Sequence, residues 1–247
     1  MGKANDSLKS MLATALSSVT ESESEFALVA LAIDGDDKAF ERIMRANNRL
    51  LYRTARSILR DDGDAEDIVQ EAYVKAYFSL KSFHGQSKLS TWLVRIVVNE
   101  ALMRKRKIKH MPEQIFTDSV EDLQELIDKN TASGQGPRSP EDLALRDELR
   151  GLIQTHIDRL PDNFRTVFVL RALEEMSVDE TALCLQIPSA TVRTRFLRAR
   201  RMLREGASID LKVAFAGAFA FAGARCDRTV AGVFERIRKL QRTTHSG

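Results

Sequence analysis

The stretch MSVDETALCLQIPSATVRTRFLRARRMLRE, residues 176–205, has the pattern of two short helices separated by a tight break. Ser177 and Glu180 have the spacing of a capping box at the start of the first helix. Pro188 predicts the break, because proline ends one helix and often opens the next, and Ser189 is expected to cap the second helix. The residues of the first helix expected to face a core are Val178, Ala182, Leu183 and Leu185. The stretch therefore predicts a helix-turn-helix.

The second of these helices combines an apolar stripe with a basic outer face. The stripe has spacings of four, three and four residues, as an amphipathic helix requires, and consists of Val192, Phe196, Ala199 and Leu203. Six arginines lie off the stripe: Arg193, Arg195, Arg198, Arg200, Arg201 and Arg204. A guanidinium donates paired hydrogen bonds to phosphates and to guanine edges, so we favour DNA as the ligand. The alternative is a solvated basic face, or one that pairs with an acidic protein.

The composition is that of a helical protein. The chain has 247 residues, a net charge of +3, 12 glycines and 5 prolines, and no alternating run rich in valine and isoleucine. Two isolated cysteines, Cys184 and Cys226, exclude a disulfide framework and favour a reducing compartment; Cys184 is expected in the core. The most apolar run, residues 213–224, is shorter than the ~20 residues of a spanning helix. We therefore expect a cytoplasmic chain without membrane insertion.

Composition also divides the chain into segments. The expected fold class is all-α, with two small helical domains joined by a flexible linker and followed by a helical extension. The segments are a disordered leader (1–22), a first domain (23–111), the linker (112–140), a helix-turn-helix domain (141–206) and the extension (207–247). In the first domain, Asp64 is expected to cap the third helix, and Ser90 or Thr91 the fourth. The extension contains a predicted basic amphipathic helix at residues 225–241.

Two further features of the first domain could bind partners. The third helix has an outward stripe of Asp67, Gln70, Glu71 and Lys75, for which a solvated face is the simpler explanation. The polar loop at residues 83–89 begins with Phe83 and leads into a basic helix that starts near Trp92. Aromatic and basic side chains together suit single-stranded DNA, where bases stack and phosphates need cations. Taken alone, however, Trp92 is more typical of a core position than of a platform for base stacking.

Several segments resemble the extracytoplasmic-function sigma factors, the small two-domain members of the bacterial sigma-70 family. DAEDIVQE (64–71) and LSTWLVRIVVNEAL (89–102) resemble the first domain of that family. LPDNFR (160–165) and the helix-turn-helix resemble its C-terminal domain, in the right order. The resemblance covers about residues 26–205. It implies an alternative sigma factor that binds core RNA polymerase, recognises the minus-thirty-five and minus-ten promoter elements, melts DNA and starts transcription of a stress- or signal-responsive regulon.

The resemblance also implies three sets of site residues. Those expected to bind core polymerase are Asp64, Glu66, Asp67, Gln70 and Glu71. Those expected at the minus-ten element are His84, Ser87, Lys88, Ser90, Thr91, Trp92, Arg95, Asn99, Arg104 and Arg106. Those expected at the minus-thirty-five element are Ser189, Thr191, Arg193, Thr194, Leu197, Arg198, Arg200 and Arg201.

The implied partners are the largest and second-largest subunits of core RNA polymerase and promoter DNA, with an anti-sigma factor as a further candidate. We expect a monomer when free, associated with the nucleoid when active. No catalytic residue, metal or cofactor is expected. His84 stands where the family commonly has arginine, which leaves the base preference at the minus-ten element open.

Alternatives remain at this stage. The extension after Gly206 is not part of the common two-domain plan; it either packs on the C-terminal domain or docks on the factor or the polymerase and regulates it. The second candidate function is a dimeric helix-turn-helix regulator that acts without polymerase binding. A nucleic-acid enzyme ranks last, because the acids at residues 61–71 are accompanied by no phosphate loop and no His-Glu-x-x-His motif.

Overall fold

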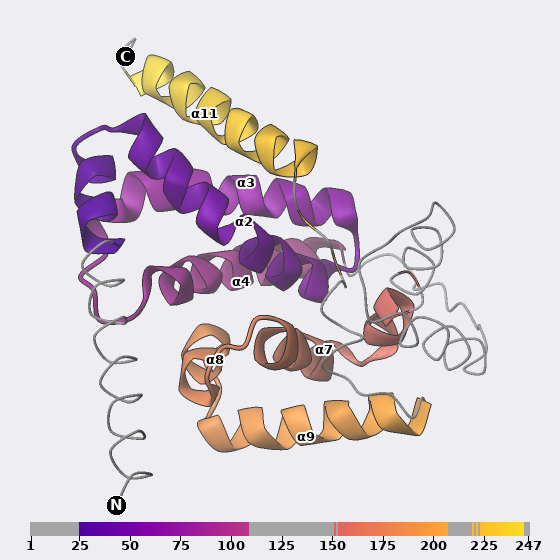
Figure 1. The fold of residues 1–247 in the computed structure, drawn as a ribbon. Coiled ribbons are helices and arrows are strands. Elements are labelled where there is room, and N and C mark those ends of the chain that lie inside the picture. The colour runs from indigo at the N-terminus through magenta and orange to yellow at the C-terminus, as the bar shows by residue number, and fades with distance from the viewer. Residues whose placement is uncertain are drawn as a thin grey trace, which may run out of the picture.

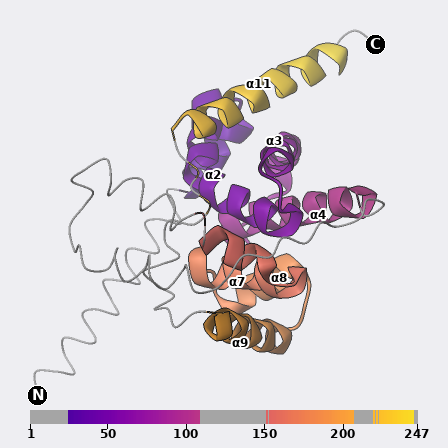
Figure 2. The same ribbon diagram turned by 90° about the vertical axis from the view of Figure 1, so that its right-hand side faces the viewer.

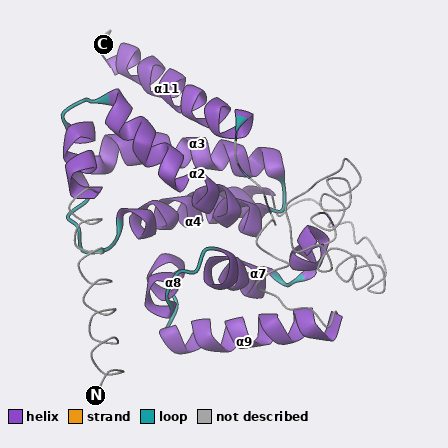
Figure 3. Ribbon diagram, in the orientation of Figure 1, coloured by secondary structure: helices purple, strands orange, loops and turns teal. Residues whose placement is uncertain are grey.

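The computed structural model describes residues 25–108, 151, 153–206, 219, 221 and 223–244. The predicted leader and linker, and Phe215 of the extension, lie outside this part of the chain. The described residues form helices and no strand (Figure 3), which confirms the all-α prediction. Within the same residues, no helix combines the length and apolarity that a membrane crossing requires.

The first bundle consists of a helix at residues 25–33, α2 (Asp37–Leu59), α3 (Asp62–Ser79), the short 3-10 helix η1 (Leu80–Ser82) and α4 (Leu89–Ile108). Asp36 caps α2, because its carboxylate accepts from the N–H groups of Lys38 and Ala39. The three long helices pack their apolar faces against one another (Figure 1). Side chains buried between them include Phe40, Ile43, Leu51, Ile68, Ala72, Ala76, Leu93, Val97 and Ala101.

Two helices of this bundle start earlier than the sequence suggested. Asp61, and not Asp64, caps α3, because its carboxylate accepts from the Asp64 N–H at 2.7 Å. The fourth helix begins at Leu89, whose N–H donates to the Glu25 carboxylate at 3.2 Å. Ser90 and Thr91 therefore lie inside α4 and do not cap it. The cap of α3 was predicted wrongly because Asp61 and Asp64 are neighbouring acids that can each cap a helix. The start of α4 was predicted wrongly because its partner, Glu25, is remote in sequence.

The helix-turn-helix domain contains a helix at residues 153–159, α7 (Asp162–Phe168), the π-helical turn η2 (Val169–Leu173), α8 (Val178–Leu185) and α9 (Ser189–Gly206). The predicted capping box is confirmed: the Glu180 N–H donates to the Ser177 hydroxyl at 3.1 Å, and the Ser177 N–H to the Glu180 carboxylate at 2.7 Å. Gln186 ends α8 in the left-handed region, with φ 53°.

Ser189 does not cap α9 as predicted. The helix already includes this residue, and the Pro188 carbonyl accepts from the N–H groups of Thr191 and Val192. The Ser189 hydroxyl instead donates to the Asp179 carboxylate on α8, at 2.7 Å. Ser189 thus ties the two helices of the motif together.

The two halves of the protein are packed against each other, with α7 and α8 against α2 and α4 (Figures 1 and 2). Arg53 of α2 forms an ion pair with Glu174 at 2.7 Å, and their side chains are only 4% and 5% exposed. Arg165 of α7 is fully buried and donates to the Ser57 carbonyl of α2 at 2.6 Å. Buried charges persist only when they are paired and hydrogen-bonded, so these contacts tie the helix-turn-helix domain to the first bundle.

Most of the described extension is one helix, α11 (Ala224–Thr244), which confirms the predicted basic amphipathic helix. It lies along the first bundle, on the side away from the helix-turn-helix domain (Figures 1 and 2). Of the two alternatives for the extension, α11 therefore follows the second, since it docks on the first bundle and not on the C-terminal domain. The side chains that hold it in place are Val230, Val233, Phe234 and Ile237, all buried.

Candidate functional site

The predicted minus-thirty-five residues form the outer face of α9. This helix lies at the end of the molecule farthest from α11 (Figure 1). Its apolar stripe faces inward as expected, with Val192, Ala199 and Leu203 buried. Ser189 and Thr191, at its start, are half-buried, and the exposed members of the predicted set are Arg193, Thr194, Leu197, Arg198, Arg200 and Arg201. Such an arginine-rich helix face matches the donors and the width that the DNA major groove accepts.

The first helix of the motif, α8, packs on α4 through a face that differs from the predicted one. Leu183 was expected inside but is 47% exposed, whereas Thr181 and Cys184 are fully buried. The Cys184 thiol donates to the Thr91 carbonyl of α4 at 3.4 Å, and burial raises the pKa of this thiol to about 12. The core position expected for Cys184 is confirmed. Contact with α4, rather than the hydrophobicity of α8 alone, decides which side of α8 is buried.

The predicted polymerase-binding residues lie together on one side of α3. We call Asp64, Glu66, Asp67, Gln70 and Glu71 the acidic face. Arginines flank it on both sides. From α4, Arg104 approaches the carboxylates of Asp64, Asp67 and Glu71 at 3.8, 3.9 and 3.8 Å. From α11, Arg225 pairs with Glu66 at 2.6 Å.

The acidic face is not a candidate metal site. Its carboxylates are directed to guanidinium groups, and no group of three or more histidine, cysteine or acidic side chains within the described part of the chain is arranged to hold a metal ion. Several carboxylates grouped on one side of a helix also present a negative surface that suits recognition of a basic partner. The acidic face is thus a group of carboxylates on one helix, bordered by arginines of α4 and α11.

The predicted minus-ten residues of the loop lie at the start of α4, beside the helix-turn-helix domain. Lys88 forms an ion pair with Glu180 of α8 at 2.9 Å, and Thr91 is buried, with 2% of its surface exposed. Ser87 and Ser90 are half-buried and His84 is exposed. Gly85 adopts a φ of +69°, and a β-carbon there would lie 2.3 Å from the Phe26 ring. Any other residue at position 85 would therefore require the Phe26 ring to move.

The predicted minus-ten residues further along α4 face in different directions. Arg95 lines a hollow beside Ser189, whereas Asn99 lines a groove next to α11. Arg104 is turned to the acidic face, and Arg106 is exposed. Trp92 is half-buried, with its ring 5.7 Å from that of Phe83. The structure thus groups the polymerase set on one side of α3 and the minus-thirty-five set on α9, each on a single helix. The minus-ten set is spread over the loop and the length of α4.

The residues that join the two halves were missed by sequence reasoning. Arg53 and Glu174 are 121 positions apart. Nothing local distinguishes Arg53 from Arg49, which is exposed on the same helix. Arg165 belongs to the LPDNFR segment, but the sequence does not show that its side chain is buried. Such pairs become visible only when both helices are placed.

Two family models match this chain. Sigma-70 region 2 matches residues 43–110, which include α3 and α4, and Sigma-70 region 4 matches residues 150–203, which include the helix-turn-helix. The segment that contains α11 lies beyond both. The acidic face therefore falls within region 2, and the exposed arginines of α9 fall mostly within region 4.

Among characterised proteins, the chain is similar to the ECF RNA polymerase sigma factor SigW of Bacillus subtilis, with 37% identity over 171 residues, 69% of this chain and 90% of that protein. It is also similar to the ECF RNA polymerase sigma-E factor of Escherichia coli K12, with 34% identity over 189 residues, 75% of this chain and 95% of that protein. Among solved structures, CnrH in complex with the cytosolic domain of CnrY has a similar fold, with a TM-score of 0.50 and 24% identity over 73% of this chain and 95% of that chain. By sequence and by fold, this chain belongs to the ECF RNA polymerase sigma factors of the sigma-70 family.

Proposed function

We propose that this chain is an alternative sigma factor that gives core RNA polymerase its promoter specificity through three separate surfaces. It acts in the cytoplasm, on the nucleoid, and contributes no catalytic residue, because the polymerase carries out the chemistry. The observation that supports this most strongly is the separation of charge. An acidic face on α3 and a basic face on α9 lie on different parts of the molecule, within regions 2 and 4 of the family.

The acidic face is the proposed binding site for the clamp coiled coil of the largest polymerase subunit. Asp67 is its most accessible carboxylate, with 53% of the side chain exposed, compared with 21% for Glu66. A cluster of carboxylates on a rigid helix presents a fixed negative potential, which steers a basic partner and sets its register. Charge reversal at Asp67 should therefore reduce the affinity for core polymerase more than charge reversal elsewhere on the acidic face.

The loop at residues 83–88 and the exposed side of α4 are the proposed site for the minus-ten strand. Cations such as Arg95 and Arg106 hold phosphates, and captured bases offset the stacking lost on melting, a few kcal/mol for each step. In the packed arrangement α8 covers Thr91 and pairs with Lys88. Full access to this site therefore requires α8 to move away from α4.

The exposed arginines of α9 form the proposed recognition surface for the minus-thirty-five element. Arg198 lies in the middle of the exposed face, beside Leu197, which is 64% exposed. A bidentate contact from an arginine to a base edge contributes about 1–3 kcal/mol of discrimination. An arginine that contacts only phosphate weakens binding to all sequences alike.

Transcription from a promoter library with purified core polymerase tests the proposal. Asp67→Arg should abolish core binding, whereas Asp34→Arg, an equal charge reversal at an exposed turn, should leave it intact. Arg198→Ala should weaken only promoters that depend on the upstream element. Its matched control is Arg204→Ala, at an exposed position near the end of the same helix.

The competing function, a dimeric regulator independent of polymerase, makes opposite predictions. It requires a chain that dimerises, binds duplex DNA specifically by itself and tolerates Asp67→Arg. Analytical ultracentrifugation and DNA binding without polymerase measure these properties directly. If the wild-type chain never binds core polymerase and behaves in this way, the sigma-factor proposal is wrong.

A further inference from the structure

Helix α11 covers part of the acidic face of α3. Its apolar side is anchored on the first bundle, where the ring of Phe234 meets that of Phe40 edge to face, with 6.4 Å between the centroids. Figure 1 shows α11 beside α3, and α11 packs more extensively on α3 than on α2. Because the segment that contains α11 lies beyond the two family models, it is an addition to the regions that define the family.

The side of α11 that meets the acidic face is complementary to it in charge. Arg225 pairs with Glu66 at 2.6 Å and with Asp62 at 3.2 Å. Arg228 lies 3.8 Å from the same Glu66 carboxylate, and Arg236 lies 3.4 Å from Asp67. The spacing of these three arginines places them on one face of a helix.

A glycine on the same helix face brings the two helices close together. A β-carbon at Gly232 would lie 2.7 Å from the Gln70 side-chain oxygen and 3.0 Å from its amide carbon. Gln70 belongs to the acidic face, so even a methyl group at position 232 requires the Gln70 side chain to rearrange, and a large side chain adds bulk between α11 and α3. The contact between α11 and the acidic face is thus close and depends on both shape and charge.

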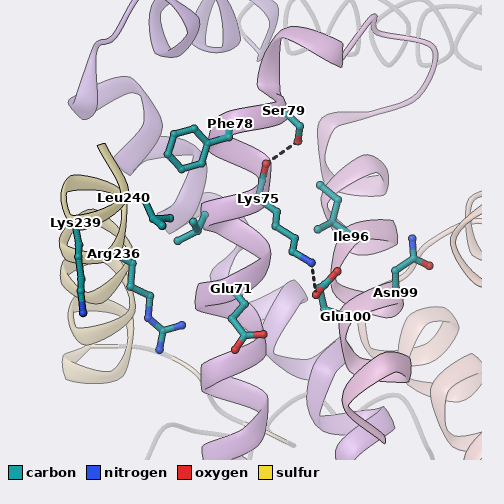
Figure 4. A pocket seen from close by; sticks show the side chains of 11 residues that line it. Glu71, Lys75, Phe78, Ser79, Ile96, Asn99, Glu100, Arg236, Lys239 and Leu240 are labelled. Atoms are coloured by element: carbon teal, nitrogen blue, oxygen red, sulfur yellow. Dashed lines mark hydrogen bonds and ion pairs between the residues drawn. The ribbon is translucent and has the colours of Figure 1, made fainter. Parts of the chain in front are cut away.

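The far end of α11 is less tightly packed. A groove of about 980 Å³ lies between α11, α3 and α4, with Phe78 and Leu240 among its apolar lining residues. Figure 4 shows the Arg236 side chain extending from α11 towards α3, near Glu71. The last turns of α11, including exposed Leu240, therefore border open space, and this is the end from which α11 can separate.

We infer that α11 is an intramolecular competitor of core polymerase for the acidic face, so that the extension restrains the factor until α11 is displaced. This inference rests on the proposed role of the acidic face. A basic surface of the polymerase and the arginines of α11 cannot occupy Glu66 and Gln70 together. If α11 is docked in most molecules, the apparent affinity for core falls in proportion to the undocked fraction.

The test labels wild type and each full-length variant separately and measures the equilibrium binding of each directly to purified core polymerase. Arg228→Glu combined with Arg236→Glu reverses two charges at accessible positions of α11. Gly232→Leu inserts bulk at the close contact. None of these changes alters α3 itself. The matched controls are Arg238→Glu and Ala231→Leu, which make the same changes at exposed positions of α11.

We expect both release variants to bind core more tightly than wild type, and both controls to match wild type. Loss of one exposed ion pair changes the docking equilibrium by a factor of about 1.4 to 5, so loss of two should raise the affinity for core by about 2- to 25-fold. A tenfold gain corresponds to a wild-type chain with α11 docked in about nine molecules of ten. Circular dichroism checks that each variant keeps its helices; if Gly232→Leu does not fold, the double charge variant decides.

The outcomes separate this inference from the function on which it rests. Wild-type binding to core without a gain in the release variants, or with weaker binding, overturns the inference and leaves the sigma-factor proposal intact. Such a result would make α11 a structural element or a polymerase contact. Failure of wild type and every variant to bind core overturns the proposed function as well. Binding by the release variants alone supports both.

Discussion

The buried ion pair between Arg53 and Glu174 offers the most quantitative test of how the two halves are joined. Glu174→Ala removes the carboxylate and leaves the guanidinium of Arg53 in a site where only 4% of its side chain is exposed. Arg53 keeps its hydrogen bond to the Phe219 carbonyl, at 3.2 Å, but loses its ion pair with Glu174. Desolvation of that charge is then no longer compensated by the carboxylate.

Removal of one member of a buried pair costs about 3–5 kcal/mol, a large part of the ~5–15 kcal/mol by which a folded domain is stable. With a urea m-value of about 2 kcal/mol/M, the unfolding midpoint should fall by about 1.5–2.5 M. The matched control is Glu41→Ala, which removes a partner of Arg45 in a pair whose side chains are 45% and 37% exposed. Exposed pairs of this kind contribute at most about 1 kcal/mol.

Urea unfolding should be followed by far-UV circular dichroism, which reports all helices, and by the fluorescence of Trp92, the single tryptophan, which reports the first bundle. Arg53→Met combined with Glu174→Leu, which replaces the pair with apolar side chains, should recover most of the lost stability. If Glu174→Ala is no more destabilised than Glu41→Ala, the pair does not hold the two halves together and the reasoning fails.

Two smaller perturbations test local features of the helix-turn-helix domain. Ser177→Ala removes the capping box of α8 and should reduce the free energy of unfolding by about 1 kcal/mol in urea unfolding, whereas no loss would show that water replaces the cap. Asp162 is partly buried, which opposes ionisation, but the hydrogen bond from Lys105 and the charge of Arg165 prevail and lower the pKa of its carboxyl below the ordinary 3.8. Asp162 therefore stabilises the fold above about pH 4, and this contribution is lost as the pH falls through the folded-state pKa. The stability difference between wild type and Asp162→Asn, measured by urea unfolding from pH 6 to pH 2, should shrink below about pH 4; a difference that stays constant would contradict the assignment.

Helices, and most of their buried faces, could be predicted from the sequence because both depend on local order. The capping box at Ser177 and the stripe of Val192, Ala199 and Leu203 were predicted correctly, since they follow from spacing along one helix. The residues at which helices begin were predicted less accurately. Asp61 and Asp64 have equivalent side chains, and only the hydrogen bond to the Asp64 N–H identifies Asp61 as the cap of α3. The roles assigned to individual site residues stay predictions, whereas the family to which the chain belongs is confirmed by its relatives.

The sequence by itself determined an all-α chain with an acidic stripe, a basic recognition helix and a basic final helix, because composition and periodicity are properties of each segment. Tertiary structure decided which of these segments meet. It buried Arg53 against Glu174, placed Glu25 at the start of α4, and laid the arginines of α11 on the acidic face. These contacts join residues far apart in the chain, so they depend on how helices pack rather than on how any helix forms. The physical reason is that charge pairing and close packing act through space, and the sequence order carries no direct record of them.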